Sequence, residues 1–481
     1  MGGWLSQIGF LGAPVREFLI RNSLTVGVGL YALAAVALVA IFVRQGNQIA
    51  DKPQPAALWE LALLVGILLL ACFLRVYLWQ EIPPGVHVDE AINGLNSLGI
   101  LVRDHNTIYF ENSDGREILL PYLIAFAFRL FGISLFAFKM VPLAISLLTI
   151  VVIYQLGREL FNRQVGLLAA FLMAVSKWHL LISRVTHEAV PLPLLTALVI
   201  LFLVRAFRRG KWRDYLACGL FLGLGMYTYP AFRAVPAIVA IYALGRLLLE
   251  RGFASRHFLG LATAAGVSLA VFAPFGLYIK DHWEMFGQRM RVTSFYMDPH
   301  YNGDALSTLW ANTLKTLTLF YTDNMAVYYL HNDTVLDVVS TILFTLGLVY
   351  CLWFWRKQHN ALLPIWFAAG LLPSVLSHAV RLPHALRIAP LIPLAPLLVA
   401  VAGWYLWQTL AKAGLGRIVA NLLLAGALVL VAALNLNTYF VTYAHNANVY
   451  ESFDPVPSHT ALAINDLNQK YDVFVMPLIS E

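Results

Sequence analysis

Two adjacent carboxylates, Asp89 and Glu90, follow a proline-rich segment in Pro83-Pro-Gly-Val-His-Val-Asp-Glu-Ala91. Apolar residues then recur at helical spacing, which predicts an amphipathic helix that begins near Asp89. One acid at such a position is explained as a helix cap that binds the free backbone N–H groups of the first turn. The second acid is more than a cap requires. The pair therefore indicates chemistry, because a carboxylate within hydrogen-bond reach of a hydroxyl can act as a general base.

The same segment offers ligand types for a divalent metal, at His87, Asp89 and Glu90. One histidine and two adjacent acids do not fill the coordination shell of a metal without ligands from elsewhere in the chain. The sequence thus predicts no cofactor firmly, and a divalent metal at these three residues stays as the alternative.

Further ionisable and aromatic residues gather in three short segments between long apolar runs. They are Arg184, His187 and Glu188 in the first segment, Tyr229 and Arg233 in the second, and His378, Arg381, His384 and Arg387 in the third. Arginines suit phosphate oxygens because the guanidinium is a forked donor. Any single arginine can instead be an anchor that reaches lipid headgroups, but a whole set at membrane depth indicates function.

The composition shows which elements must position these residues. The 481 residues are 60% hydrophobic and 12% charged, whereas soluble chains are roughly 45–50% apolar and about 25% charged. This indicates an integral membrane protein. The formal charge of +7 is spread between apolar runs, which excludes a nucleic-acid partner. The three cysteines lie in such runs and are expected to pack there.

About twelve apolar runs are long enough to cross about 30 Å of hydrocarbon as helices, which predicts an all-α polytopic fold. The runs are 24–43, 58–79, 138–156, 164–182, 189–205, 214–230, 234–249, 258–280, 336–355, 361–378, 387–410 and 418–440. The shorter run from Ile118 to Phe131 is expected to be a juxtamembrane helix, since counting it as a span would place the later basic loops outside. The long loops 80–137 and 281–335 are then external.

The acidic pair and the segments after it resemble the first external loop of the GT-C membrane glycosyltransferases. The likeness is to the protein O-mannosyltransferase and aminoarabinose-transferase-like families (glycosyltransferase family 39-like), through Asp89-Glu90-Ala91, Gly94-Leu-Asn-Ser-Leu98, Leu119-Leu-Pro-Tyr-Leu-Ile-Ala125 and Phe131-Gly-Ile-Ser134. It implies a GT-C-like domain over 58–440. Residues 1–57 would add one transmembrane helix and a cytoplasmic linker, and 441–481 an external segment.

The resemblance implies an inverting transfer of a hexose or pentose from a polyisoprenyl-phosphate donor to a hydroxyl on the outer face of the membrane. The basic cytoplasmic loops and compact external loops suit a plasma membrane, although the endoplasmic reticulum has the same sidedness. The acceptor is left open between protein, lipid and glycan, in contact with membrane lipid. The match to the acidic position of the family makes Asp89 the general base, with Glu90 beside it. For the donor phosphate we expect Arg387, His384 and Arg381 first, then Arg233 and Arg184; His87, His187, Glu188 and Tyr229 are expected to contact substrate.

Two other functions fit the same chain. A secondary transporter would explain twelve spans, but transporters place polar groups near the bilayer midplane, often in repeated halves. A lipid-pyrophosphate-dependent glycan ligase or polymerase would use arginines more than a carboxylate base, so it should largely survive loss of Asp89.

Overall fold

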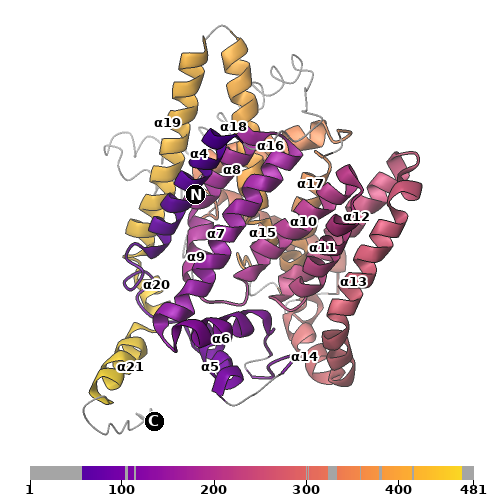
Figure 1. Ribbon diagram of the computed structural model, residues 1–481. Helices are drawn as coiled ribbons and strands as arrows, with labels where there is room; N and C mark the ends of the chain where they lie inside the picture. Colours follow the sequence, from indigo (N-terminus) through magenta and orange to yellow (C-terminus); the bar gives the residue numbers. More distant parts are fainter. Residues whose placement is uncertain are drawn as a thin grey trace.

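The computed structural model describes residues 57–102, 107–112, 115–298, 301, 303–322, 333–357, 359–378, 382–413 and 416–468. The regular structure of these residues is helical, with two isolated β-bridges in addition, Phe110 with Arg116 and Ser294 with Ser377. The prediction of an all-α polytopic protein is confirmed (Figure 1). The predicted span 24–43 and the candidate Arg381 lie outside the described residues.

The helices of the first half are α4 (Leu58–Val76), α5 (Val88–Val102), α6 (Leu119–Phe131), α7 (Leu135–Leu160), α8 (Arg163–Val175), α9 (Lys177–Arg184), α10 (Pro191–Arg209), α11 (Trp212–Gly225), η1 (Pro230–Arg233) and α12 (Ala234–Leu249). The second half contains α13 (Phe253–Asp281), α14 (Trp283–Thr293), η2 (Phe295–Met297), α15 (Ala305–Tyr321), α16 (Val338–Trp353), α17 (Leu362–Val375), η4 (Ala389–Leu391), α18 (Leu394–Lys412), α19 (Gly416–Asn437), η5 (Thr438–Tyr443), α20 (Ala447–Ser452) and α21 (Pro455–Asn468).

Seven helices of the described residues are long and apolar enough to cross a membrane, or eight if the bent pair α8–α9 counts as one span. α16 and α17 are apolar but shorter. Each predicted run within the described part of the chain overlaps a helix or this bent pair, while the predicted number of twelve is not confirmed.

The bend between α8 and α9 measures 58° and falls at Ser176. The Ser176 side chain accepts the backbone N–H of His179 and so caps α9. Directly after the bend, Lys177 is fully buried and its Nζ lies 2.6 Å from Oδ2 of Asp333. A buried ammonium needs such a partner because an unpaired charge is costly away from water.

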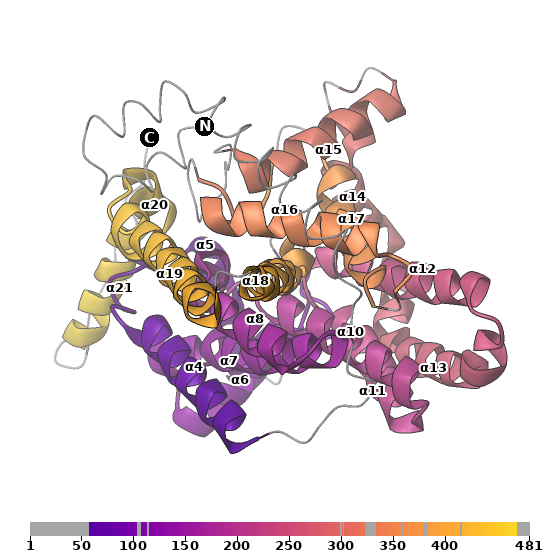
Figure 2. The same cartoon turned by 90° about the horizontal axis from the view of Figure 1, so that it is seen from above.

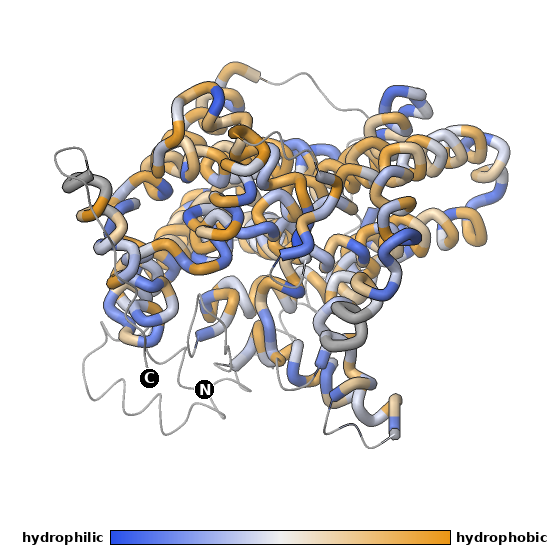
Figure 3. The backbone as a smooth tube through the Cα atoms, turned by 90° about the horizontal axis from the view of Figure 1, so that it is seen from below, coloured by the Kyte–Doolittle hydropathy of each residue, from blue (hydrophilic) through white to orange (hydrophobic). Residues whose placement is uncertain are grey.

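α18 is the central helix of the bundle. Figure 2 shows it end-on, with α8 on one side, α16 on the opposite side and α19 beside it. α16 approaches it closely, since a Cβ added at Gly347 would lie 2.2 Å from the carbonyl oxygen of Leu398. Apolar residues line the spans, and hydrophilic residues concentrate at their connections (Figure 3). The core is therefore apolar helix packing.

The sequence predicted a long external loop over 281–335, whereas the described residues of this segment are largely helical. α14 and α15 lie within it, and α15 packs on α17. Asn312 of α15 donates hydrogen bonds of 3.0 Å to the carbonyl oxygens of Val375 and Ser377. Polar side chains satisfied by a neighbouring helix explain why hydropathy missed this helix.

α5, α6, α14, α20 and α21 lie at one end of the bundle, which we call the α5 end (Figure 1). The end of α18 and the start of α19 lie at the opposite end (Figure 1). The predicted juxtamembrane helix from Ile118 to Phe131 is α6, which packs against α5. The α5 end thus collects the polar segments that the sequence singled out.

Candidate active site

The first turn of α5 is capped by His87, although the sequence suggested Asp89 for this role. The backbone N–H of Asp89 donates to Nδ1 of His87 at 3.1 Å, and the N–H of His87 donates to Oε1 of Glu90 at 3.4 Å. This reciprocal pattern is a capping box with histidine in place of serine or threonine. The Asp89 carboxylate is therefore not used as a cap.

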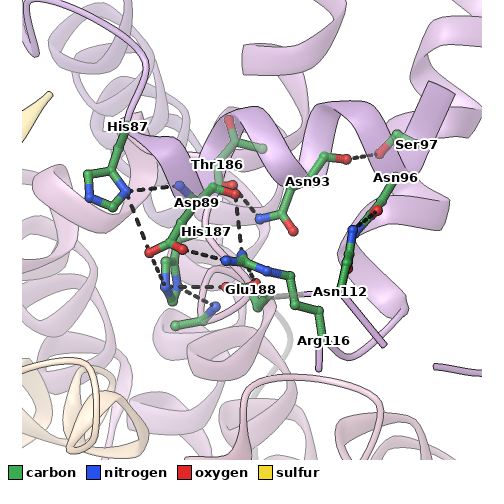
Figure 4. Close-up of polar contacts among 11 residues, drawn as sticks. His87, Asp89, Asn93, Asn96, Ser97, Asn112, Arg116, Thr186, His187 and Glu188 are labelled. Atoms are coloured by element: carbon green, nitrogen blue, oxygen red, sulfur yellow. Dashed lines mark hydrogen bonds and ion pairs between the residues drawn. The ribbon is translucent and has the colours of Figure 1, made fainter. Parts of the chain in front are cut away.

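Asp89 instead shares one arginine with a second acid. The Arg116 guanidinium forms ion pairs with Oδ1 of Asp89 and with Oε1 of Glu188 (Figure 4). The Asp89 side chain is 24% exposed, whereas those of Arg116 and Glu188 are 7% and 8% exposed. Asp89 is thus the member of this trio that substrate can reach most easily.

Two imidazoles face the other oxygen of Asp89. Oδ2 lies 3.5 Å from Nδ1 of His87 and 4.0 Å from Nε2 of His187. Nε2 of His187 also lies 3.2 Å from Glu188, while its Nδ1 accepts the N–H of Ala189. This pattern assigns the proton of a neutral His187 to Nε2. The ring of Tyr229 packs edge-on against His187, with 5.6 Å between centroids.

The surroundings favour the ionised form of Asp89. Burial raises the pKa of its carboxyl group, but the His187 imidazole, the Arg116 guanidinium and the His87 imidazole outweigh burial and hold the pKa below its ordinary value. For His87, burial dominates over Asp89 and Glu90 and lowers its pKa. These surroundings favour the ionised form of Asp89 and disfavour protonation of His87.

Glu90 lies behind this group and is fully buried. Its Oε2 pairs with Nζ of Lys139 in α7 and accepts the backbone N–H of Thr186 at 2.6 Å. It therefore joins the start of α5 to α7 and to the turn that carries His187. The sequence placed Glu90 among the catalytic residues, but its contacts are those of a positioning residue.

Three of the cations predicted to bind the donor phosphate, Arg233, Arg387 and His384, lie in or next to the short helices η1 and η4. Arg233 of η1 lies 3.7 Å from Glu117 and 4.9 Å from the centroid of Phe286, so it adjoins the segment that carries Arg116. Arg387 and His384 precede η4, which packs on η1 and on α10.

Arg184 differs from these cations, because it donates to the carbonyl oxygens of Leu74, Tyr77 and Leu78 at 2.7–3.0 Å. It stabilises the end of α4, and we do not retain it as a donor ligand.

The described residues contain no group of three His, Cys, Asp or Glu side chains placed to hold a metal ion. Within the suggested set of His87, Asp89 and Glu90, the Oε2 of Glu90 is occupied by Lys139 and by a backbone N–H. With these contacts the set does not fit a metal ion.

Comparison with known proteins bears on the whole bundle. Residues 116–278 match the family model described as dolichyl-phosphate-mannose-protein mannosyltransferase. ArnT from Cupriavidus metallidurans, solved with undecaprenyl phosphate, aligns at a TM-score of 0.57 with 17% identity, over 87% of this chain and 82% of its own.

The Archaeoglobus fulgidus oligosaccharyltransferase, solved with Zn and sulfate, aligns at a TM-score of 0.53 and 16% identity, over 78% of this chain. The chain spans about half of that enzyme's length, 53%. Archaeal AglB from the same organism, solved with an inhibitory peptide and a dolichol-phosphate, aligns at 0.53 and 15% identity, over 82% of this chain and 56% of its own. No curated protein sequence matches significantly.

The chain has the GT-C fold. The predicted resemblance to GT-C membrane glycosyltransferases is confirmed at the level of the fold, and residues 116–278 match the family model. The matched range includes Arg116, His187 and Glu188 but begins after Asp89. The assignment of Asp89 in the GT-C chain therefore rests on its own contacts, described above.

Sequence reasoning missed two residues of this GT-C site, Arg116 and Lys139. Arg116 lies next to Gly115, whose φ of +89° marks a turn that favours glycine. Lys139 lies inside an apolar run, where a lone cation indicates a buried acidic partner. The sequence itself carries only the cation of Lys139 within an apolar run and the glycine before Arg116, and neither indicates the partner of these residues.

Proposed function

We propose that this GT-C chain transfers a sugar from a polyprenyl-phosphate-linked donor to an acceptor hydroxyl, with Asp89 as general base. The acceptor oxygen attacks the anomeric carbon and its proton passes to Oδ2 of Asp89. The bond between that carbon and the phosphate oxygen breaks, and the lipid phosphate leaves with the electron pair. Attack opposite the leaving group inverts the configuration. The observation that carries this proposal is a partly exposed, ionised carboxylate with one oxygen anchored by Arg116.

Arg116 and Glu188 have distinct parts in this mechanism. Arg116 fixes Oδ1 of Asp89 and leaves Oδ2 directed at the imidazoles of His87 and His187. Such fixation keeps the base in a reactive orientation, which is a large part of catalysis. Glu188 balances the second half of the guanidinium charge, and with His187 and Tyr229 it forms the side on which we expect the acceptor.

We assign the phosphate to Arg233 and Arg387. Fixed cations stabilise the charge that develops on a leaving phosphate. Arg233 lies 3.7 Å from Glu117, the neighbour of Arg116, and Arg387 precedes η4, which packs on η1 and on α10. The ArnT and AglB structures were solved with undecaprenyl phosphate and dolichol-phosphate, which supports a donor of this class.

The proposed orientation places the α5 end at the outer face of the plasma membrane. α10 begins soon after Glu188 and is 19 residues long, so Arg205, Arg208 and Arg209 in its last turns lie away from the α5 end. Positive charge on the cytoplasmic side is the common arrangement in multispanning proteins.

The test is transfer of labelled sugar from a polyprenyl-phosphate donor to membrane acceptors by proteoliposomes, for wild type, Asp89→Asn and Glu81→Gln, with and without chelator. Glu81 is an exposed acid of the same loop, so Glu81→Gln is the matched control. Loss of transfer in Asp89→Asn alone, unaffected by chelator, supports the proposal.

Three outcomes would contradict it. Equal transfer by wild type and Asp89→Asn would remove Asp89 as the base. Loss of transfer with chelator would require a metal. If wild type consumes no donor, the transferase function itself fails and transport becomes the function to test.

A further inference from the structure

The C-terminal segment that follows the last long helix packs against the turn that carries His87. After η5 the chain forms α20 and α21, and the link between them contains Phe453. Phe453 is fully buried, and its ring stands edge-on to His87 with 6.0 Å between centroids. A residue near the end of the described chain thus contacts the residue that caps α5.

Two further contacts bind the same turn. The backbone N–H of Val86 donates to Oγ of Ser458 in α21 at 2.9 Å. A Cβ added at Gly85 would lie 2.2 Å from the carbonyl oxygen of Phe453 and 3.1 Å from Cα of Pro455. Three consecutive residues, Gly85 to His87, are therefore held by the segment 453–458.

The link between α20 and α21 has a backbone conformation that must be maintained by its surroundings. Asp454 has a φ of +45°, which lies in the left-handed region that residues other than glycine rarely adopt. Strain of this kind persists where packing determines the conformation, and it is common near functional sites. Here it directs Phe453 into the interior, while Val456 of the next turn is 69% exposed.

We propose that Phe453 and Ser458 are positioning residues that fix the orientation of Asp89 by holding the Gly85–His87 turn. The contacts form a chain: Phe453 packs on His87, Nδ1 of His87 accepts the N–H of Asp89, and the Asp89 carboxylate reaches Arg116. Neither residue touches the reacting atoms. This inference extends the proposed function, since it rests on Asp89 being the base.

The experiment compares Phe453→Ala and Ser458→Ala with the matched control Val456→Ala, using the full chain in proteoliposomes. We expect Phe453→Ala to lower kcat by roughly 10–100-fold, because displacing a catalytic group by about 1 Å has an effect of that order. The KM for the polyprenyl-phosphate sugar should not change. Ser458→Ala removes one hydrogen bond and should have the smaller effect, and Ser458→Thr should restore the rate because it keeps the hydroxyl.

A double variant separates positioning from general structure. If Phe453 acts through Asp89, Asp89→Asn with Phe453→Ala should be no slower than Asp89→Asn alone, because the group that Phe453 positions is already lost. Multiplied losses in the double variant, or equal kcat values for Phe453→Ala and Val456→Ala, would overturn the proposal.

Amide hydrogen exchange tests the contact without any activity. Peptides that cover residues 86–90 should exchange faster in Phe453→Ala and Ser458→Ala than in wild type and Val456→Ala. Unchanged exchange would overturn the proposal even if the rates fell. Should Phe453→Ala fail to fold, Phe453→Leu and Ser458→Ala supply the same comparison. An inactive wild type with altered exchange in the variants would contradict the proposed function while leaving the contact confirmed.

Discussion

Both ends of the bundle hold a buried carboxylate group bound by arginine, but the ratio of acid to base is reversed. At the α5 end, Asp89 and Glu188 share the single Arg116. At the opposite end, Glu159 of α7 is surrounded by Arg205, Arg208 and Arg209 of α10. The first group thus has two acids and one arginine, and the second has one acid and three arginines.

This difference distinguishes a carboxylate that can take part in catalysis from one that only joins two helices. Both carboxylate oxygens of Glu159 are covered by arginines, and its side chain is 4% exposed, so it can only join α7 to α10. Asp89 keeps one oxygen that faces His87 and His187, and its side chain is 24% exposed. An acid in excess over its arginines, with an accessible oxygen, is the arrangement that can accept a proton.

The largest expected effect is on the transfer rate and comes from replacing Asp89, with Glu159 at the opposite end as the residue for comparison. Asp89→Asn should lower the transfer rate by about 10²–10⁴-fold, the usual contribution of general base catalysis. Glu159→Gln should lower the thermal stability but leave turnover per folded molecule unchanged. Rates and melting curves measured on both variants decide this, and equal rate losses would break the comparison.

Replacing the shared arginine should have the next largest effect, and one that depends on pH. Arg116 contributes to the lowered pKa of Asp89, so Arg116→Gln should raise that pKa. Because the base must be ionised to accept a proton, the acidic limb of the pH–rate profile should move to higher pH. At neutral pH we expect roughly a 10–100-fold loss from misplacement of the base.

Arg209→Gln is the matched control for this profile, since Arg209 binds a carboxylate at the other end. Its acidic limb should coincide with that of wild type. An unmoved limb in Arg116→Gln would show that Arg116 does not act on the base.

Glu90→Gln should have an intermediate effect, chiefly on stability. It leaves the ammonium of Lys139 without its buried partner, and breaking a buried ion pair costs about 3–5 kcal/mol. We expect a lower unfolding midpoint in denaturant and a modest loss of rate. The double variant with Lys139→Met should be more stable than Glu90→Gln alone, because no unpaired charge remains; a further decrease would contradict this account.

The smallest effect on stability should come from replacing one of the three arginines around Glu159. Arg209 is 28% exposed and two other arginines remain beside the acid, so Arg209→Gln should cost only about 0.2–1 kcal/mol of unfolding free energy. Melting curves at low and high salt test this value. A loss of unfolding free energy as large as that of Glu90→Gln would mean that single ion pairs stabilise the two ends to the same extent.

Periodicity and hydropathy predicted the helices that form the spans, because burial in an apolar environment depends on local composition. They missed α15, whose Asn312 is buried and satisfied only through contacts with residues more than sixty positions away. Hydropathy penalises a polar residue regardless of such partners.

In the candidate site, Asp89 was predicted from the acidic pair and from its resemblance to the first external loop of the GT-C families, and the structure places it beside Arg116, His87 and His187. Arg116 could not be paired with it, since the contacts to Asp89 and Glu188 bridge 27 and 72 positions. The place of Phe453 beside His87 was equally hidden, because ring packing leaves no pattern in the local sequence.

The buried pair of Lys177 and Asp333 has a consequence for the order of synthesis. The two residues are 156 positions apart, so the bent span α8–α9 enters the membrane before the partner of its lysine has been made. At about 5–20 residues per second, the ammonium waits roughly 8–30 s. A lysine at the centre of an isolated helix costs about 2.5–3.5 kcal/mol on insertion. The buried lysine of the first half therefore gains its partner only when residues of the second half have been made.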